Sequence, residues 1–143
     1  MTEGPVTASA VVRYATELEN QSAAFYRALA ARFSTLGQTY EGFAQDCEKS
    51  AMQIQRTYQE TVTDALETGF AFPGLSLGAY ALDVDLPEGI RQEEATARAL
   101  ALEERALAFY EQVGEQSASL LAAIGRAFKR AARMRRRRKG KLL

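Results

Sequence analysis

Apolar residues recur at intervals of three and four along much of the chain, the spacing that places them on one face of an α-helix. In the first such segment, Val11, Leu18, Phe25 and Leu29 share one face, and Thr7 precedes it as a suitable N-cap. Four segments show this periodicity, and the helices they predict span about residues 7–33, 37–68, 88–113 and 117–136.

The connections between these segments predict how the helices are arranged. The first two helices, and the last two, are separated by only a few residues, and joints that short make consecutive helices antiparallel neighbours. The middle connection, residues 70–87, is long and apolar but interrupted by Gly and Pro, so we expect a crossover packed along the bundle. The sequence therefore predicts one all-α domain over residues 1–143, a four-helix bundle of two antiparallel hairpins joined by a long crossover.

A short motif, L-E-x₅-F-Y, occurs once in each predicted hairpin. It begins at Leu18 in the first helix and recurs 84 residues later at Leu102 in the third. Four identities at fixed spacing in so short a chain indicate a duplicated hairpin. The tyrosines of the two motifs, Tyr26 and Tyr110, are expected in the core, with their hydroxyls seeking the glutamates as partners.

Composition excludes several kinds of chemistry. The chain has no histidine, which removes imidazole catalysis and every histidine-ligated metal site. Its single cysteine, Cys47, forms no intramolecular disulfide and is expected to be a small core residue. No apolar run is long enough to span a membrane and no targeting segment is visible, so we expect a cytoplasmic protein.

The formal net charge of zero conceals two oppositely charged parts. Residues 126–143 carry ten Lys and Arg and no acid, whereas residues 1–125 carry eight basic and all 18 acidic residues. We expect residues 133–143 to form a basic tail that is mobile after about Arg136, because consecutive arginines repel. Such a run is either a solvated helix end or a binding segment for phosphate, an anionic membrane surface, an acidic protein or, without reading bases, a polyanion. The residues expected to contact a polyanion are Arg133, Arg135, Arg136, Arg137, Arg138 and Lys139.

The repeated motif on a two-hairpin layout resembles the rubrerythrin branch of the ferritin-like family, over essentially the whole chain from Thr7 to about Arg138. The resemblance implies a ferritin-like bundle and a homodimer. It also implies the family's site for two iron ions, held by one Glu from each of two helices and a Glu-x-x-His from each of the others. Glu19 and Glu103 match the first pair of glutamates.

At the remaining four ligand positions of the family pattern, this sequence has residues other than Glu and His. On the second helix they fall on Cys47 and Ser50, and on the fourth helix on Arg135 and Arg138. The fourth helix then points Arg135, together with Arg138, at the two glutamates, so we expect a guanidinium in place of the metal charge. In the rival arrangement the helix ends earlier, Arg135 faces water, and Tyr26 and Tyr110 alone bond the glutamates.

Three interpretations of function remain open. The first is a degenerate bundle without metal or other cofactor, acting as a structural or interaction module and not as an enzyme. The second is a divergent oxidoreductase of rubrerythrin type, with iron held by Glu19, Glu103 and Glu48 and completed by substrate or a partner subunit. The third is a polyanion-binding protein in which the acidic bundle carries the basic tail.

Overall fold

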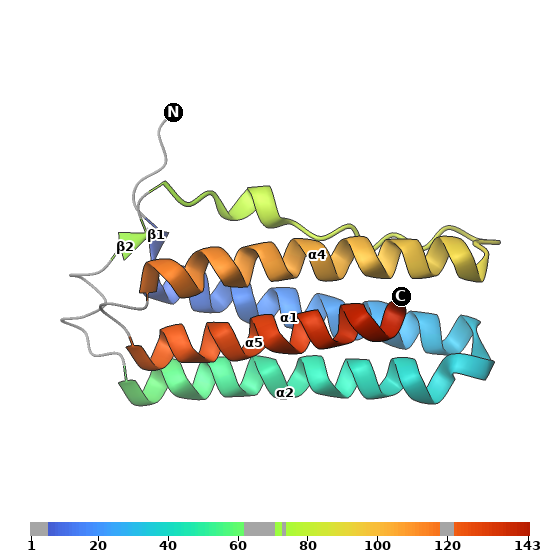
Figure 1. Cartoon of the computed structure of the whole chain (residues 1–143), viewed down its shortest axis with the longest axis horizontal. Coiled ribbons are helices and arrows are strands. Elements are labelled where there is room, and N and C mark those ends of the chain that lie inside the picture. Colours follow the sequence, from blue (N-terminus) through green and yellow to red (C-terminus); the bar gives the residue numbers. More distant parts are fainter. Residues whose placement is uncertain (1–5, 62–70, 73, 118–121) are drawn as a thin grey trace.

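The computed structural model describes residues 6–61, 71–72, 74–117 and 122–143. In this part of the chain the fold is a bundle of long helices lying side by side (Figure 1), as the periodicity predicts. Its helices are α1 (Ala8–Arg32), α2 (Gly37–Thr61), α4 (Gln92–Ser117) and α5 (Ala122–Leu142).

The helices form two antiparallel hairpins. A 3₁₀ turn, η1 (Ser34–Leu36), joins α1 to α2, and α5 returns alongside α4 (Figure 1). Between the hairpins the chain runs back along α4 and includes a second 3₁₀ turn, η2 (Leu77–Tyr80). Because this crossover returns the chain to the end of the bundle at which α2 begins, α4 runs parallel to α2 and antiparallel to α1 (Figure 1).

A small strand pairing closes one end of the bundle. Strand β1 (Val6–Thr7) pairs antiparallel with β2 (Ala71–Phe72), so that Val6 lies opposite Phe72. Thr7 then caps α1, because its hydroxyl oxygen accepts a hydrogen bond of 3.1 Å from the backbone N–H of Ala10. This pairing was not predicted, since two residues of strand have no periodicity to detect.

Both ends of helix α4 differ from the predicted ones. Helix α4 spans Gln92–Ser117 instead of about 88–113, because Gly89 turns with a positive φ of 76° before it and Gly114 does not end it. Gly114 is buried within α4, where a Cβ would lie 3.4 Å from Cγ of Lys129 on α5, so glycine allows close helix contact. Helix α2 ends at Thr61, and the predicted continuation over residues 62–68 lies outside the described residues.

The residues after Arg136, predicted to form a mobile tail, are helical in this structure. Helix α5 continues to Leu142. The reason is that core-facing positions continue along α5 at intervals of three and four residues. Arg135 and Arg138 are buried, and Leu142 packs against the core. The residues that end the chain are thus part of the bundle and not a separate arm.

Buried apolar residues form two clusters at successive levels of the bundle. On α1 the first cluster ends at Leu18 and the second begins at Ala23. The buried polar residues Glu19 and Ser22 occupy the level between them. Among the described residues no helix is long and apolar enough to cross a membrane.

A buried charged centre as candidate functional site

The level between the two apolar clusters contains charged side chains that are almost completely removed from water. Within the described chain the buried charged residues are Glu19 of α1 (1% exposed), Glu103 of α4 (0%), and Arg135 (1%) and Arg138 (3%) of α5. Two carboxylates and two guanidiniums balance one another. Burying an unbalanced charge is very costly, so this equality is a condition for the fold.

Arg135 bridges the two glutamates. Its Nη2 donates to Oε2 of Glu19 at 2.6 Å, and its Nη1 donates to Oε2 of Glu103 at 2.8 Å. Nη2 also donates to the hydroxyl oxygen of Ser22 at 3.0 Å, while that hydroxyl donates to the carbonyl of Leu18. The planar guanidinium thus uses its fork to hold two carboxylates from different hairpins. This is the contact that the register of the fourth helix predicts.

The two tyrosines of the repeated motif cross between the hairpins. The hydroxyl of Tyr26 on α1 donates to Oε2 of Glu103 on α4 at 2.6 Å. The hydroxyl of Tyr110 on α4 donates to Oε2 of Glu19 on α1 at 2.5 Å. Each copy of the motif therefore supplies the tyrosine that bonds the glutamate of the other copy. The tyrosine–glutamate bonds expected if Arg135 faced water are thus present together with the bonds from Arg135.

Burial and charge both act on the ionisation of these groups. Burial, and then the negative charge of Glu19, raise the pKa of Tyr110 well above its ordinary value. Burial, and then the negative charge of Glu103, likewise raise the pKa of Tyr26. Burial alone lowers the pKa of the Arg135 guanidinium, but the carboxylates of Glu103 and Glu19 outweigh it and hold that pKa above the usual range. The centre therefore keeps neutral tyrosines and a cationic arginine at neutral pH.

Arg138 completes the charge balance in a less well satisfied position. Its Nη1 lies 3.3 Å from Oε1 of Glu103, and its guanidinium carbon lies 5.8 Å and 5.6 Å from the ring centroids of Tyr26 and Phe43. These distances are those of cation–π contacts. The Nε of Arg138 is buried without a hydrogen-bond partner. Arg138 is thus held by one carboxylate and two aromatic rings.

The positions on α2 contribute apolar surroundings in place of ligands. Cys47 is fully buried, and Ser50 is 6% exposed. Burial raises the pKa of the Cys47 thiol to about 12, despite the opposing effect of the nearby Arg135, so the thiol stays protonated and unreactive at neutral pH. Cys47 behaves as the small core residue that the sequence predicts.

Glu48, the third predicted carboxylate of an iron site, lies elsewhere. Its side chain is 48% exposed and pairs with Arg27, which also pairs with Glu41 at 3.2 Å. The hydrogen bond from Arg27 lowers the pKa of Glu48. A helix position adjacent to Cys47 points about 100° away from it, so Glu48 cannot share its face. The prediction that Glu48 joins the two buried glutamates is wrong in this structure.

The residues around the two glutamates do not fit the iron pair that the family resemblance implies. The Oε2 atoms of Glu19 and Glu103 each already accept bonds from an arginine and a tyrosine. Within the described part of the chain, no group of three or more Asp, Glu, Cys or His side chains is placed to hold a metal ion. An iron pair needs several carboxylate or imidazole ligands with open positions, and a guanidinium offers only donors.

The predicted polyanion-binding set divides into two groups. Arg135 and Arg138 face inward and are unavailable to a partner, which corrects the prediction, because their helix positions belong to the core face of α5. The other four point outward or sideways: Arg133 and Arg137 are exposed, Arg136 pairs with Glu111 at 3.3 Å, and Lys139 pairs with Glu104 at 3.4 Å.

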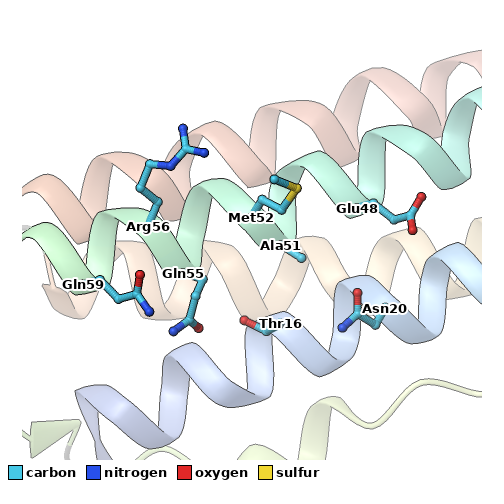
Figure 2. Close-up of a pocket in the computed structure, with 8 residues that line it drawn as sticks. All are labelled: Thr16, Asn20, Glu48, Ala51, Met52, Gln55, Arg56 and Gln59. Carbon is cyan, nitrogen blue, oxygen red and sulfur yellow. The ribbon is translucent and has the colours of Figure 1, made fainter.

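A surface groove of about 460 Å³ lies between α1 and α2 (Figure 2), and none of the buried charged residues lines it. Amide, hydroxyl and charged side chains line it, with Met52 at its rim and 61% exposed. The lining residues are Thr16, Asn20, Glu48, Ala51, Met52, Gln55, Arg56 and Gln59. Because it is open to solvent, this groove lacks the enclosure typical of a small-molecule pocket.

Two members of the centre were not identified from the sequence. Ser22 stands one helical turn after Glu19, and that spacing is the signal that would have placed it beside Arg135. The contact of Phe43 with Arg138 depends on how α2 and α5 pack, which no pattern along a single helix reveals. Comparison of the chain with family models, with curated proteins and with solved structures finds no match.

Proposed function

We propose that this protein is a metal-free, ferritin-like bundle that acts as a structural or interaction module and not as an iron enzyme. The observation that carries this proposal is the Arg135 guanidinium bridging Glu19 and Glu103. A cation attached to the chain supplies the positive charge that a bound metal supplies in an active relative. Such a centre needs no cofactor and leaves no ligand position open to oxygen or peroxide.

Two features support the ferritin-like part of the proposal. The hairpins are connected by one long crossover, which makes α2 and α4 parallel (Figure 1). The repeated motif also places its glutamates at the same level, where the tyrosine bonds cross between the hairpins. A bundle descended from a duplicated hairpin with a central acidic pair accounts for both features.

The oxidoreductase alternative is weakened by the same geometry. It needs Glu48 as a third ligand, and Glu48 lies on the surface with Arg27. It also needs Arg135 to leave the two glutamates, which would strand a buried cation without its partners. We therefore favour a role in which the bundle is a rigid framework and its surfaces make the contacts.

For one of those surfaces we propose a second copy of the chain as the partner. On the outer face of α2, Glu48 and Arg56 lie one helical turn before and after the exposed Met52 (Figure 2). An antiparallel pairing of two α2 helices about a two-fold axis at Met52 places Glu48 of each copy beside Arg56 of the other. The face is thus complementary to itself in charge, and this supports the expected homodimer.

Iron uptake tests the metal-free proposal. The wild-type protein is purified from iron-supplemented cells and again after anaerobic loading with ferrous iron, and its metal content is measured. The matched control is Glu19→Gln/Glu103→Gln/Arg135→Met/Arg138→Met, which removes the acidic pair together with its two buried counter-charges, so that no buried charge is left unbalanced. We expect the iron content of the wild type to equal that of the control. Two irons per wild-type chain, lost from the control, would contradict the proposal.

A further inference from the structure

Helix α5 presents a row of cations on the side that faces away from the core. Arg126, Arg130, Arg133, Arg137 and Lys141 are all exposed, and we call these five residues the basic face of α5. Their spacing of four, three, four and four residues keeps them within about 80° of one another around the helix, over a length of about 22 Å. The core residues Phe128 and Arg135 lie on the opposite side.

The described part of the chain offers the cations of the basic face no acidic partners. Within the described residues, none of the five forms an ion pair. The surface acids Glu111 and Glu104 of α4 pair instead with Arg136 and Lys139 at the flank of α5. Neighbouring cations about 5–6 Å apart along a helix repel one another, and a bound polyanion relieves that repulsion.

The basic face is rigid because the opposite side of the same helix is fixed in the bundle. The buried Arg135 and Arg138 anchor α5 to Glu19 and Glu103, and Leu142 packs onto the second apolar cluster. A partner therefore meets cations already arranged in a row, with no loss of backbone freedom on binding.

We propose that the basic face of α5 binds the phosphate backbone of double-stranded nucleic acid without reading its sequence. Four of the five cations are arginines, whose forked donors match phosphate oxygens. A face about 22 Å long lies along a stretch of duplex whose axis carries about six phosphates per strand, one for every 3.4 Å of axis. The one aromatic residue of α5, Phe128, is buried, so no ring is available to stack on unpaired bases.

Other anionic partners fit this face less well. A membrane-bound helix inserts an apolar side into the bilayer, and the apolar side of α5 is used inside the bundle. A stable protein interface needs buried apolar anchors, yet the exposed large apolar side chains of the described residues are Met52, Val84 and Leu143, none of them on the basic face. The acidic remainder of the molecule is screened beyond about 8 Å at physiological salt, so the local charge decides.

The inference rests on the proposed interaction role and is independent of the metal content of the centre. Its test is fluorescence anisotropy of a labelled DNA duplex titrated with the full chain at several salt concentrations. Five phosphate contacts predict that the logarithm of the binding constant falls with the logarithm of salt with a slope of about −4.5. The triple variant Arg130→Gln/Arg133→Gln/Arg137→Gln removes three of these contacts. It should reduce the magnitude of this slope by about 2.7 and weaken binding about tenfold or more at low salt.

The matched control is Arg13→Gln/Lys49→Gln/Arg91→Gln, which removes three exposed cations elsewhere and changes the net charge equally. We expect this control to keep the wild-type slope. Equal losses in the two variants would reduce the effect to net charge and overturn the proposal. Binding to phosphatidylserine vesicles or heparin with none to the duplex would overturn it as well. All substituted side chains lie at the surface, and circular dichroism confirms that each variant remains folded. A failure here would leave the iron measurement unaffected.

Discussion

The hydroxyl of Tyr26 on α1 lies 2.6 Å from a carboxylate oxygen of Glu103 on α4, although 77 residues separate them in sequence. Tyr110 and Glu19 make the same contact in the reverse direction. The pair of contacts relates the two hairpins by an approximate two-fold symmetry, which the α5-borne guanidiniums of Arg135 and Arg138 break. The centre thus combines a repeated pair of Glu–Tyr contacts with two cations that come from α5 alone.

This symmetry predicts similar costs for removing either tyrosine hydroxyl. In Tyr26→Phe and in Tyr110→Phe the ring is kept and one bond to a charged acceptor is lost. Each substitution should lower the free energy of unfolding by about 1.5–3 kcal/mol. Urea denaturation monitored by circular dichroism measures both losses. If one substitution costs several times as much as the other, the two halves are not equivalent.

Much of this arrangement follows from helical periodicity. Extending the core face of the fourth segment from Phe128 and Ala131 leads to Arg135 and Arg138, and the structure places both in the core. The same reasoning does not extend α5 to Leu142. The run of arginines before Leu142 contains no apolar residues whose spacing would predict further helix, and Leu142 packs against the core only in the folded bundle. The pairing of β1 with β2 depends on the three-dimensional path of the chain and has no local pattern.

The role of Gly114 and the orientation of Glu48 could not be predicted from the sequence for a different reason. Gly114 reads as a helix end, whereas in the structure it allows α4 to approach α5 closely. Glu48 differs from Cys47 by one position, and only the packing of α2 decides which of them faces the core. Such choices depend on which helices become neighbours, and a single helix cannot reveal that.

Stability should fall at high pH through Cys47. Burial raises the pKa of its thiol to about 12, whereas an exposed thiol titrates near 8.5. The folded protein therefore holds a proton that the unfolded chain releases. The resulting stability is complete below about pH 8 and is lost as the pH rises toward 12. Urea midpoints between pH 7 and 11 should decline less for Cys47→Ala than for the wild type.

The raised pKa values of Tyr26 and Tyr110 act in the same direction, above the ordinary tyrosine pKa of about 10. The decline in stability between pH 8 and 9 separates the thiol from the two tyrosines, because tyrosine is still largely neutral there in both the folded and the unfolded state. Identical curves for Cys47→Ala and the wild type in that region would show that the thiol does not titrate on unfolding.

Self-association through α2 is tested by exchanging charges. Glu48→Arg places like charges opposite each other in the proposed antiparallel pairing and should weaken the dimer, as should Arg56→Glu. The double variant Glu48→Arg/Arg56→Glu restores opposite charges across the two-fold axis and should restore the dimer. Sedimentation velocity gives the fraction of dimer for each. A monomeric wild type, or a double variant no better than the single ones, would exclude this face.

The most direct measurement of the central claim is a double-mutant cycle between Arg135 and Glu103. Arg135→Met leaves the buried carboxylates without their bridging cation, and Glu103→Gln removes one of the charges it holds. Breaking a buried pair from one side should cost about 3–5 kcal/mol. Because either substitution alone already breaks the contact, the double variant should lose less than the two single losses combined.

Unfolding free energies in urea for the wild type, both single variants and the double variant give the coupling energy. If the guanidinium of Arg135 holds the acidic pair in place of a metal, the account predicts a coupling of about 2 kcal/mol or more, within the range for residues in one charged network. Losses that add to within about 0.5 kcal/mol would contradict it, because residues that do not interact give that result.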